Sequence, residues 1–119
     1  ASSSICSNQA HCALSATIFC GALGPEGLYE MAHHSLSKAH YFQKELAAIG
    51  LELTYDQPFF HEFVTSVPNA QVILDCLDKA NILGGYPLDE HHLLWCVTEK
   101  VSKQTLDDIV LRIKEVLHG

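Results

Sequence analysis

The chain has 119 residues, a length that corresponds to one domain of ordinary size. Hydrophobic residues make up 48% of it and charged residues 18%, proportions that exclude an intrinsically disordered chain. The formal net charge of −7 at pH 7 provides no basic excess with which to bind nucleic acid or an anionic membrane.

The five cysteines are an odd number and include no Cys-X-X-Cys pair. We expect them to be reduced thiols that act as small buried hydrophobic residues in a cytoplasmic protein, rather than a disulfide framework. The first residues lack the basic start of a signal peptide, and no apolar run approaches the ~20 residues that span a bilayer. The cysteines are Cys6, Cys12, Cys20, Cys76 and Cys96.

Residues 10–23 predict a helix of small residues that is apolar on nearly all sides. Such a helix must be buried on more than one side, whereas the rest of the chain supplies a layer for one side only. We therefore expect that the chain is part of something larger, or that it associates with another copy through residues 10–23.

Residues 24–27 predict a break followed by the start of a second helix. Pro25 fixes φ for a first helical position, and Glu26 complements the dipole of the new helix. Apolar residues then recur at helical spacing over residues 28–49, and Gly50 suits the position just after the helix. This second helix should be about 25 residues, or roughly 37 Å, long.

Two strands and a third helix are expected next. Residues 51–55 alternate between apolar and polar side chains, and residues 59–67 form an apolar run that a proline ends. Asn69 predicts the N-cap of a helix that continues through Ala80. Asn81 suits the left-handed position after that helix, which asparagine tolerates better than most residues.

Residues 82–100 are the segment around which we expect the chain to be organised. Gly84 and Gly85 have no side chains, so the backbone can approach another backbone or a ligand closely at this point. The strand 93–97 contains the only tryptophan and is apolar on both faces, which predicts a central strand covered on both sides. Ser102 then predicts the N-cap of a last amphipathic helix.

These elements give the order ααββαββα, an α+β fold in which a small antiparallel or mixed sheet has helices on one face. We expect a single domain over residues 1–119, with two leading helices in residues 1–49 and the sheet with its helices in residues 50–119.

The sequence contains no complete catalytic set. Its eight histidines include no pair four residues apart on a predicted helix, the usual spacing for metal binding. His92 and Cys96 share a face of a strand, but no third ligand accompanies them, and a solvated histidine with a core thiol is the favoured interpretation. A nucleophilic Cys12 or Cys96 would need a histidine partner and an accessible site, so both are interpreted as inert.

Two glutamates are more informative than the cysteines. Glu62 and Glu99 lie in, or at the end of, apolar strands, where an unpaired carboxylate is costly to bury. Two interpretations stay open. Each glutamate pairs with a lysine or arginine at a strand edge or interface, or each lies at a domain or subunit boundary near an active site.

Five stretches, taken in order over essentially the whole length, resemble one known family: residues 3–10, 23–28, 56–63, 82–85 and 97–100. They resemble the C-terminal region of subunit 1 of the split P-protein of the glycine cleavage system, glycine dehydrogenase (decarboxylating). His61 departs from the family, which has asparagine there, and Asn81 departs from a glycine.

The resemblance implies the small C-terminal domain of a fold type I, pyridoxal phosphate (PLP)-dependent transferase-like protein. The P-protein decarboxylates glycine on PLP and passes the aminomethyl group to the lipoyl-lysine of the H-protein. In the split form the PLP-carrying lysine belongs to subunit 2, so subunit 2 and the H-protein are the implied partners. None of Lys38, Lys79 and Lys100 is assigned that role.

The resemblance therefore assigns no catalytic residue, no cofactor-binding residue and no metal ligand to this chain, which should be inactive alone. It leaves a set of residues expected at an interface or close to the active site of the intact complex. These are His61, Glu62, Gly84, Gly85 and Glu99. The alternative is a free-standing, ferredoxin-like module that binds a small ligand at Gly84 and Gly85 or regulates another protein.

Overall fold

The computed structural model describes residues 7–119. The chain divides into two compact units, Ala1–His33 and His34–Gly119, and each is described by itself. Cys6, one of the five predicted reduced thiols, and the first part of the stretch 3–10 lie outside the described residues.

Helix α1 (Ser7–Ala48) is interrupted at Gly24, whose φ of 67° and ψ of 178° are not helical. Glycine adopts a positive φ without steric cost, and the following Pro25 is favoured at the first position of a new helix. The predicted break at residues 24–27 is therefore confirmed. The helix ends as expected before Gly50, which has a φ of 93°.

The first unit contains the part of α1 that is rich in small and apolar residues. Leu14, Ile18 and Phe19 are 58%, 62% and 52% exposed, so this apolar surface is not covered. These exposures agree with the apolar face expected on residues 10–23, and self-association through the same residues stays a prediction. Among the described residues, no helix is both long and apolar enough to cross a membrane.

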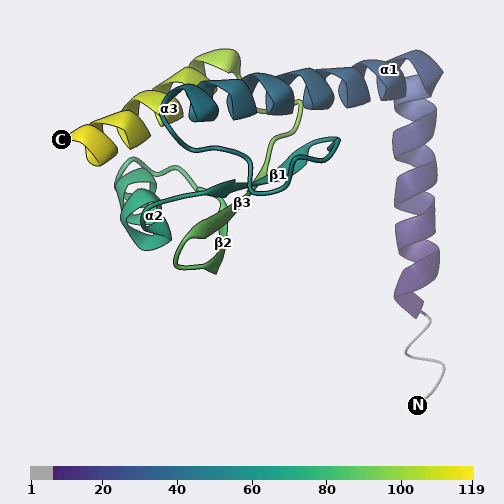
Figure 1. The fold of residues 1–119 in the computed structure, drawn as a ribbon. Coiled ribbons are helices and arrows are strands. Elements are labelled where there is room, and N and C mark those ends of the chain that lie inside the picture. Colours follow the sequence, from purple (N-terminus) through teal and green to yellow (C-terminus); the bar gives the residue numbers. More distant parts are fainter. Residues whose placement is uncertain (1–6) are drawn as a thin grey trace. The chain divides into compact units, whose positions relative to one another are not determined.

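The second unit contains a three-stranded antiparallel sheet with the order β1-β3-β2 (Figure 1). Strand β3 therefore has the central place predicted for it. Strand β2 includes Pro87, which an edge strand tolerates because proline has no N–H to donate to a neighbour. The strands are β1 (Glu62–Ser66), β2 (Tyr86–Asp89) and β3 (His92–Cys96).

The predicted strand at residues 51–55 was wrong, since only Leu53 forms a bridge, with Thr65 of β1. Two backbone hydrogen bonds flank this bridge, from Thr54 N–H to the carbonyl of Val64 and from Ser66 N–H to the carbonyl of Glu52. The turn-forming residues that follow end the pairing at once. One strand, not two, therefore precedes helix α2, and the fold is α+β.

The prediction that the central strand is covered on both faces was also wrong. Leu93 and Trp95 of β3 are buried, whereas His92 and Leu94 are half-buried and Cys96 is exposed. A continuous apolar run does not distinguish a strand covered on both faces from an antiparallel strand covered on one. The buried face packs against α1, α2 and α3 through a shared core that includes Phe42, Leu77 and Ile113.

The helix boundaries follow the predicted caps. The Asn69 side chain accepts a hydrogen bond from the N–H of Val72 at the start of α2 (Ala70–Lys79), and Asn81 has a φ of 57°. The Ser102 hydroxyl accepts one from the N–H of Thr105 at the start of α3 (Lys103–His118).

The cysteines are not the buried residues that their apolar surroundings predicted. All four described cysteines are free. Cys12, Cys20 and Cys96 are exposed, and Cys76 is partly buried. The cause is that α1 is uncovered in the first unit and that Cys96 lies on the outer face of the sheet.

The tryptophan at the centre of the core is held by one polar contact. The indole Nε1–H of Trp95 donates to the hydroxyl of Thr65, which is fully buried, at 2.8 Å. The ring also meets Phe42 edge to face, with ring centres 5.4 Å apart. A buried donor without a partner costs free energy, so Thr65 stabilises the packing of the tryptophan.

We predict that Thr65→Val lowers the free energy of unfolding by about 1–3 kcal/mol, because it leaves the indole N–H buried without an acceptor. Urea unfolding followed by circular dichroism measures this change. In a Trp95→Phe background, where the donor is absent, Thr65→Val should cost clearly less. Equal costs in the two backgrounds would show that the hydrogen bond has no such role.

Candidate functional site

Gly84 and Gly85 connect α2 to β2 and lie directly against neighbouring elements. A Cβ atom at Gly84 would lie 2.9 Å from Cδ2 of Leu74, and one at Gly85 would lie 2.6 Å from the backbone oxygen of Leu94. Gly85 has no room for a side chain, because the close atom belongs to the backbone, whereas at Gly84 the ends of leucine side chains would have to shift. The predicted close approach of backbone to backbone is therefore confirmed at Gly85, and packing of the protein itself accounts for both glycines.

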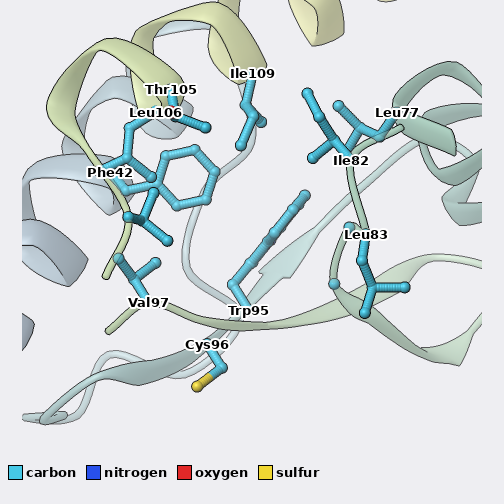
Figure 2. Close-up of a pocket in the computed structure, with 13 residues that line it drawn as sticks. Phe42, Leu77, Ile82, Leu83, Trp95, Cys96, Val97, Thr105, Leu106 and Ile109 are labelled. Atoms are coloured by element: carbon cyan, nitrogen blue, oxygen red, sulfur yellow. The ribbon is translucent and has the colours of Figure 1, made fainter. Parts of the chain in front are cut away.

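A small apolar cavity of about 140 Å³ lies beside these glycines in the second unit (Figure 2). Phe42, Trp95, Leu106 and Ile109 are among the side chains that line it, and no charged side chain does. Such a lining can hold a small apolar group. It offers no cation to a phosphate or carboxylate.

Glu99 follows β3 and ties the next turn to α1. Its N–H donates to the hydroxyl of Ser35 at 3.1 Å, and that hydroxyl lies 3.3 Å from the Glu99 carboxylate. The ammonium of Lys38 donates to the backbone carbonyl of Glu99, not to its carboxylate. Among the described residues no lysine or arginine forms the predicted ion pair with the Glu99 carboxylate, and the contact with Lys38 holds the backbone of Glu99 instead.

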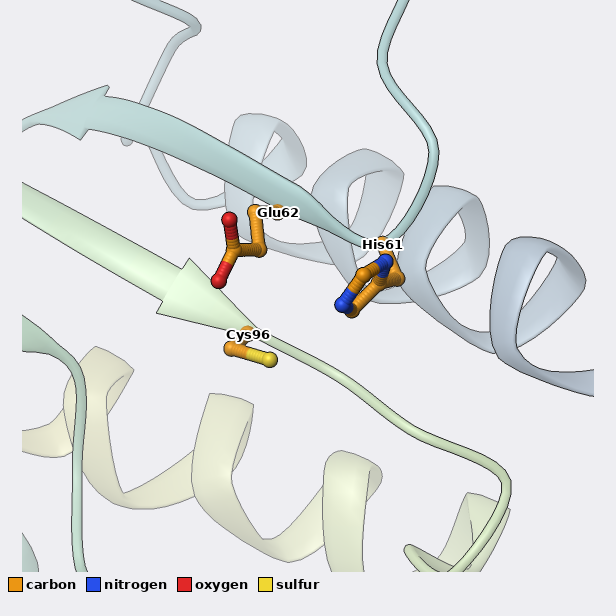
Figure 3. Close-up of side chains that lie close together, drawn as sticks. All are labelled: His61, Glu62 and Cys96. Carbon is orange, nitrogen blue, oxygen red and sulfur yellow. The ribbon is translucent and has the colours of Figure 1, made fainter. Parts of the chain in front are cut away.

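His61, Glu62 and Cys96 lie together at the ends of β1 and β3 (Figure 3). One ligating atom of each side chain lies within 4.8 Å of the other two. Glu62 is directly opposite Cys96 in the sheet, and the N–H of Val97 donates to the carbonyl of His61 at 2.9 Å. Glu62 and Cys96 are exposed, and His61 is half-buried.

The electrostatic surroundings of these three side chains are acidic. Partial burial raises the pKa of the Cys96 thiol, and the neighbouring carboxylate of Glu62 raises it further. In residues 7–119, Nδ1 of His61 is shielded from solvent and has no hydrogen-bond partner. No lysine or arginine of that range forms an ion pair with Glu62.

His92 and Cys96 do not share a site, in agreement with the interpretation that the sequence favoured. Four residues of strand separate them by roughly 13 Å, so they share a face of β3 without sharing a site. His92 lies at the other end of the strand, where its Nδ1 is 2.8 Å from the carboxylate of Asp89. The side chains close to Cys96 are Glu62 of β1 and His61 just before it, because the register brings residue 62 opposite residue 96.

The five predicted site residues therefore do not form one site. The structure brings His61 and Glu62 together, and Gly84 and Gly85 together, whereas Glu99 is tied to α1. Cys96 was missed as a neighbour of His61 and Glu62. It contributes to the wall of the apolar cavity, while its sulfur points to the other side of β3 (Figure 2).

Comparison with known proteins decides the family. Residues 1–113 match the family model of the glycine cleavage system P-protein. The chain belongs to the glycine cleavage system P-protein family. The five predicted site residues all lie within the matched range.

Relatives of this P-protein family member are named as subunit 1. Probable glycine dehydrogenase (decarboxylating) subunit 1 of Desulfitobacterium hafniense is 42% identical over 124 residues, which cover 98% of this chain and 28% of that protein. The protein of the same name from Bacillus mycoides is 42% identical over 117 residues, which cover 92% of this chain and 26% of that protein.

A solved structure shares the fold. The crystal structure of a glycine decarboxylase (P-protein) of the glycine cleavage system, in inhibitor-bound form, matches with a TM-score of 0.77 and 30% sequence identity. The match covers 83% of this chain and 24% of that one. The chain therefore spans about a quarter of the length of the relatives it matches.

Proposed function

We propose that this chain acts as the small C-terminal part of subunit 1 of a glycine-cleaving P-protein and is inactive by itself. The observation that carries the proposal is the match of residues 1–113 to the P-protein family, with relatives named as subunit 1 that are about four times as long. In the intact complex, subunit 2 and the lipoyl H-protein are the proposed partners. The reaction is decarboxylation of glycine and transfer of the aminomethyl group.

The apolar cavity beside Gly84 and Gly85 does not fit PLP. The coenzyme would supply the electron sink for loss of CO₂ from glycine, and a protein that holds it needs donors for its phosphate and a free lysine amine. The cavity beside Gly84 and Gly85 is lined without any lysine or arginine, and Lys38 is engaged with Glu99. We therefore propose that the partner subunit holds PLP.

The contribution of this chain is then structural. The exposed apolar surface of residues 10–23, which includes Leu14, Ile18 and Phe19, is a surface for another protein body. Leu83, beside the two glycines, is 99% exposed and is a second apolar contact point for another protein body. Contacts of this kind would hold the small sheet in place beside the active site of the complex.

The alternative, a module that captures a small ligand at Gly84 and Gly85, has less support. The space beside the two glycines, which have no side chains, is occupied by Leu74 and Leu77 of α2 and by the backbone of β3. A ligand would have to displace packing contacts of the protein to reach it. The glycines are accounted for without a ligand.

We predict that the purified chain shows no PLP absorbance after incubation with the coenzyme and no glycine–bicarbonate exchange. The reason is the absence of cationic and lysine groups from the cavity. Intact P-protein with H-protein is the positive control for both measurements. Exchange activity of the chain alone would remove the proposal that it is an inactive part.

We also predict that the purified chain associates with itself through residues 10–23, because the apolar side chains there are exposed. Ile18→Asp should shift sedimentation towards the monomer. Leu111→Asp is the matched control, since Leu111 is a similarly exposed residue of α3 at 54% and should not change the association. A wild-type chain that is monomeric at every concentration would contradict this prediction.

A further inference from the structure

The cluster of His61, Glu62 and Cys96 has no part in the proposed function, and its chemistry is distinctive. It combines an imidazole nitrogen, a carboxylate oxygen and a thiol sulfur, all within 4.8 Å of one another. These are three of the side-chain types that bind Zn²⁺ in proteins. Mg²⁺ and Ca²⁺ prefer oxygen ligands alone, so the thiol and the imidazole favour a transition metal.

The fold holds two of the three side chains in register. Because the N–H of Val97 donates to the carbonyl of His61, residues 61 and 97 are a hydrogen-bonded pair of the antiparallel ladder. The next pair, Glu62 and Cys96, is then a non-hydrogen-bonded pair, in which side chains approach most closely. His61 supplies the third ligand from the residue just before β1.

The distances suit a zinc ion after a small adjustment. Zinc–ligand bonds of about 2.0–2.3 Å place two ligands of a tetrahedral site roughly 3.3–3.8 Å apart. The present separations are at most 4.8 Å. Glu62 and Cys96 are exposed, so rotation of their side chains can shorten these separations by about 1 Å without disturbing the core.

A cation would also balance a carboxylate that lacks a basic partner. In residues 7–119, no lysine or arginine forms an ion pair with Glu62. A carboxylate and a thiolate together balance the charge of a divalent ion, and a neutral imidazole adds no charge. Such a site would join β1 to β3 at the ends of the strands.

We infer that His61, Glu62 and Cys96 form a binding site for a divalent transition-metal ion, best matched by Zn²⁺, with water in the fourth position. The described residues supply three ligands in this group, which leaves the fourth position open. The site lies on the sheet face that the helices do not cover, so the ion can enter from solvent.

The test is titration of the purified, metal-free chain with Co²⁺ under reducing conditions, followed by displacement with Zn²⁺. A thiolate-to-cobalt charge-transfer band should saturate at one ion per chain and disappear when Zn²⁺ is added. Cys96→Ser should abolish the band, and His61→Asn and Glu62→Gln should each weaken Co²⁺ binding at least tenfold.

The matched controls are Cys12→Ser and His92→Asn, which change an exposed thiol and an exposed-face histidine outside the cluster and should bind Co²⁺ as the wild type does. Absence of the band in the wild type, or its persistence in Cys96→Ser, would overturn the inference. X-ray absorption of the Zn²⁺-loaded wild type tests it without any variant. One sulfur at about 2.3 Å with nitrogen and oxygen at about 2.0–2.2 Å is expected, and a shell without sulfur contradicts it.

Discussion

The pairing of β1 with β3 is the constraint on which the second unit depends. The register that sets Glu62 opposite Cys96 also sets Phe63 opposite Trp95. Because side chains alternate between the two faces of a strand, a shift by one residue would exchange the core face with the outer face. This single register therefore decides both what the helices cover and which polar groups gather outside.

The two faces of the sheet have separate consequences. On the inner face, Trp95 fills the centre of the core and keeps its N–H satisfied by Thr65, and Gly85 lets the backbone before β2 pack against β3. On the outer face, Glu62 and Cys96 remain accessible and acquire His61 as a neighbour. The inner face holds the core of the second unit together, and the proposed metal site uses the outer face.

Local signals in the sequence predicted the element boundaries well. Asn69 and Ser102 cap their helices, Asn81 and Gly50 adopt a positive φ, and Gly24 interrupts α1, because each of these effects depends on a few neighbouring residues. The family could also be predicted, since the resemblance rests on short stretches in a fixed order.

Features that depend on distant residues could not be predicted in this way. To predict the alternation of burial along β3, one must know that no layer covers its outer face. The apolar residues 93–97 alone do not contain that information. The grouping of Cys96 with His61 and Glu62 depends on a register between residues more than thirty positions apart. Local pattern offered only His92 as a partner for Cys96, a pairing that was disfavoured, and His92 lies at the other end of β3.

Disulfide formation measures the register of β1 against β3 most directly. In a chain whose other cysteines are replaced by serine, Glu62→Cys should form a disulfide with Cys96 under mild oxidation, because the two residues are directly opposite. Ser66→Cys, which is opposite His92 and roughly 13 Å along the sheet, should keep both thiols free. A linked Ser66→Cys chain, or a Glu62→Cys chain that keeps both thiols, would contradict the account.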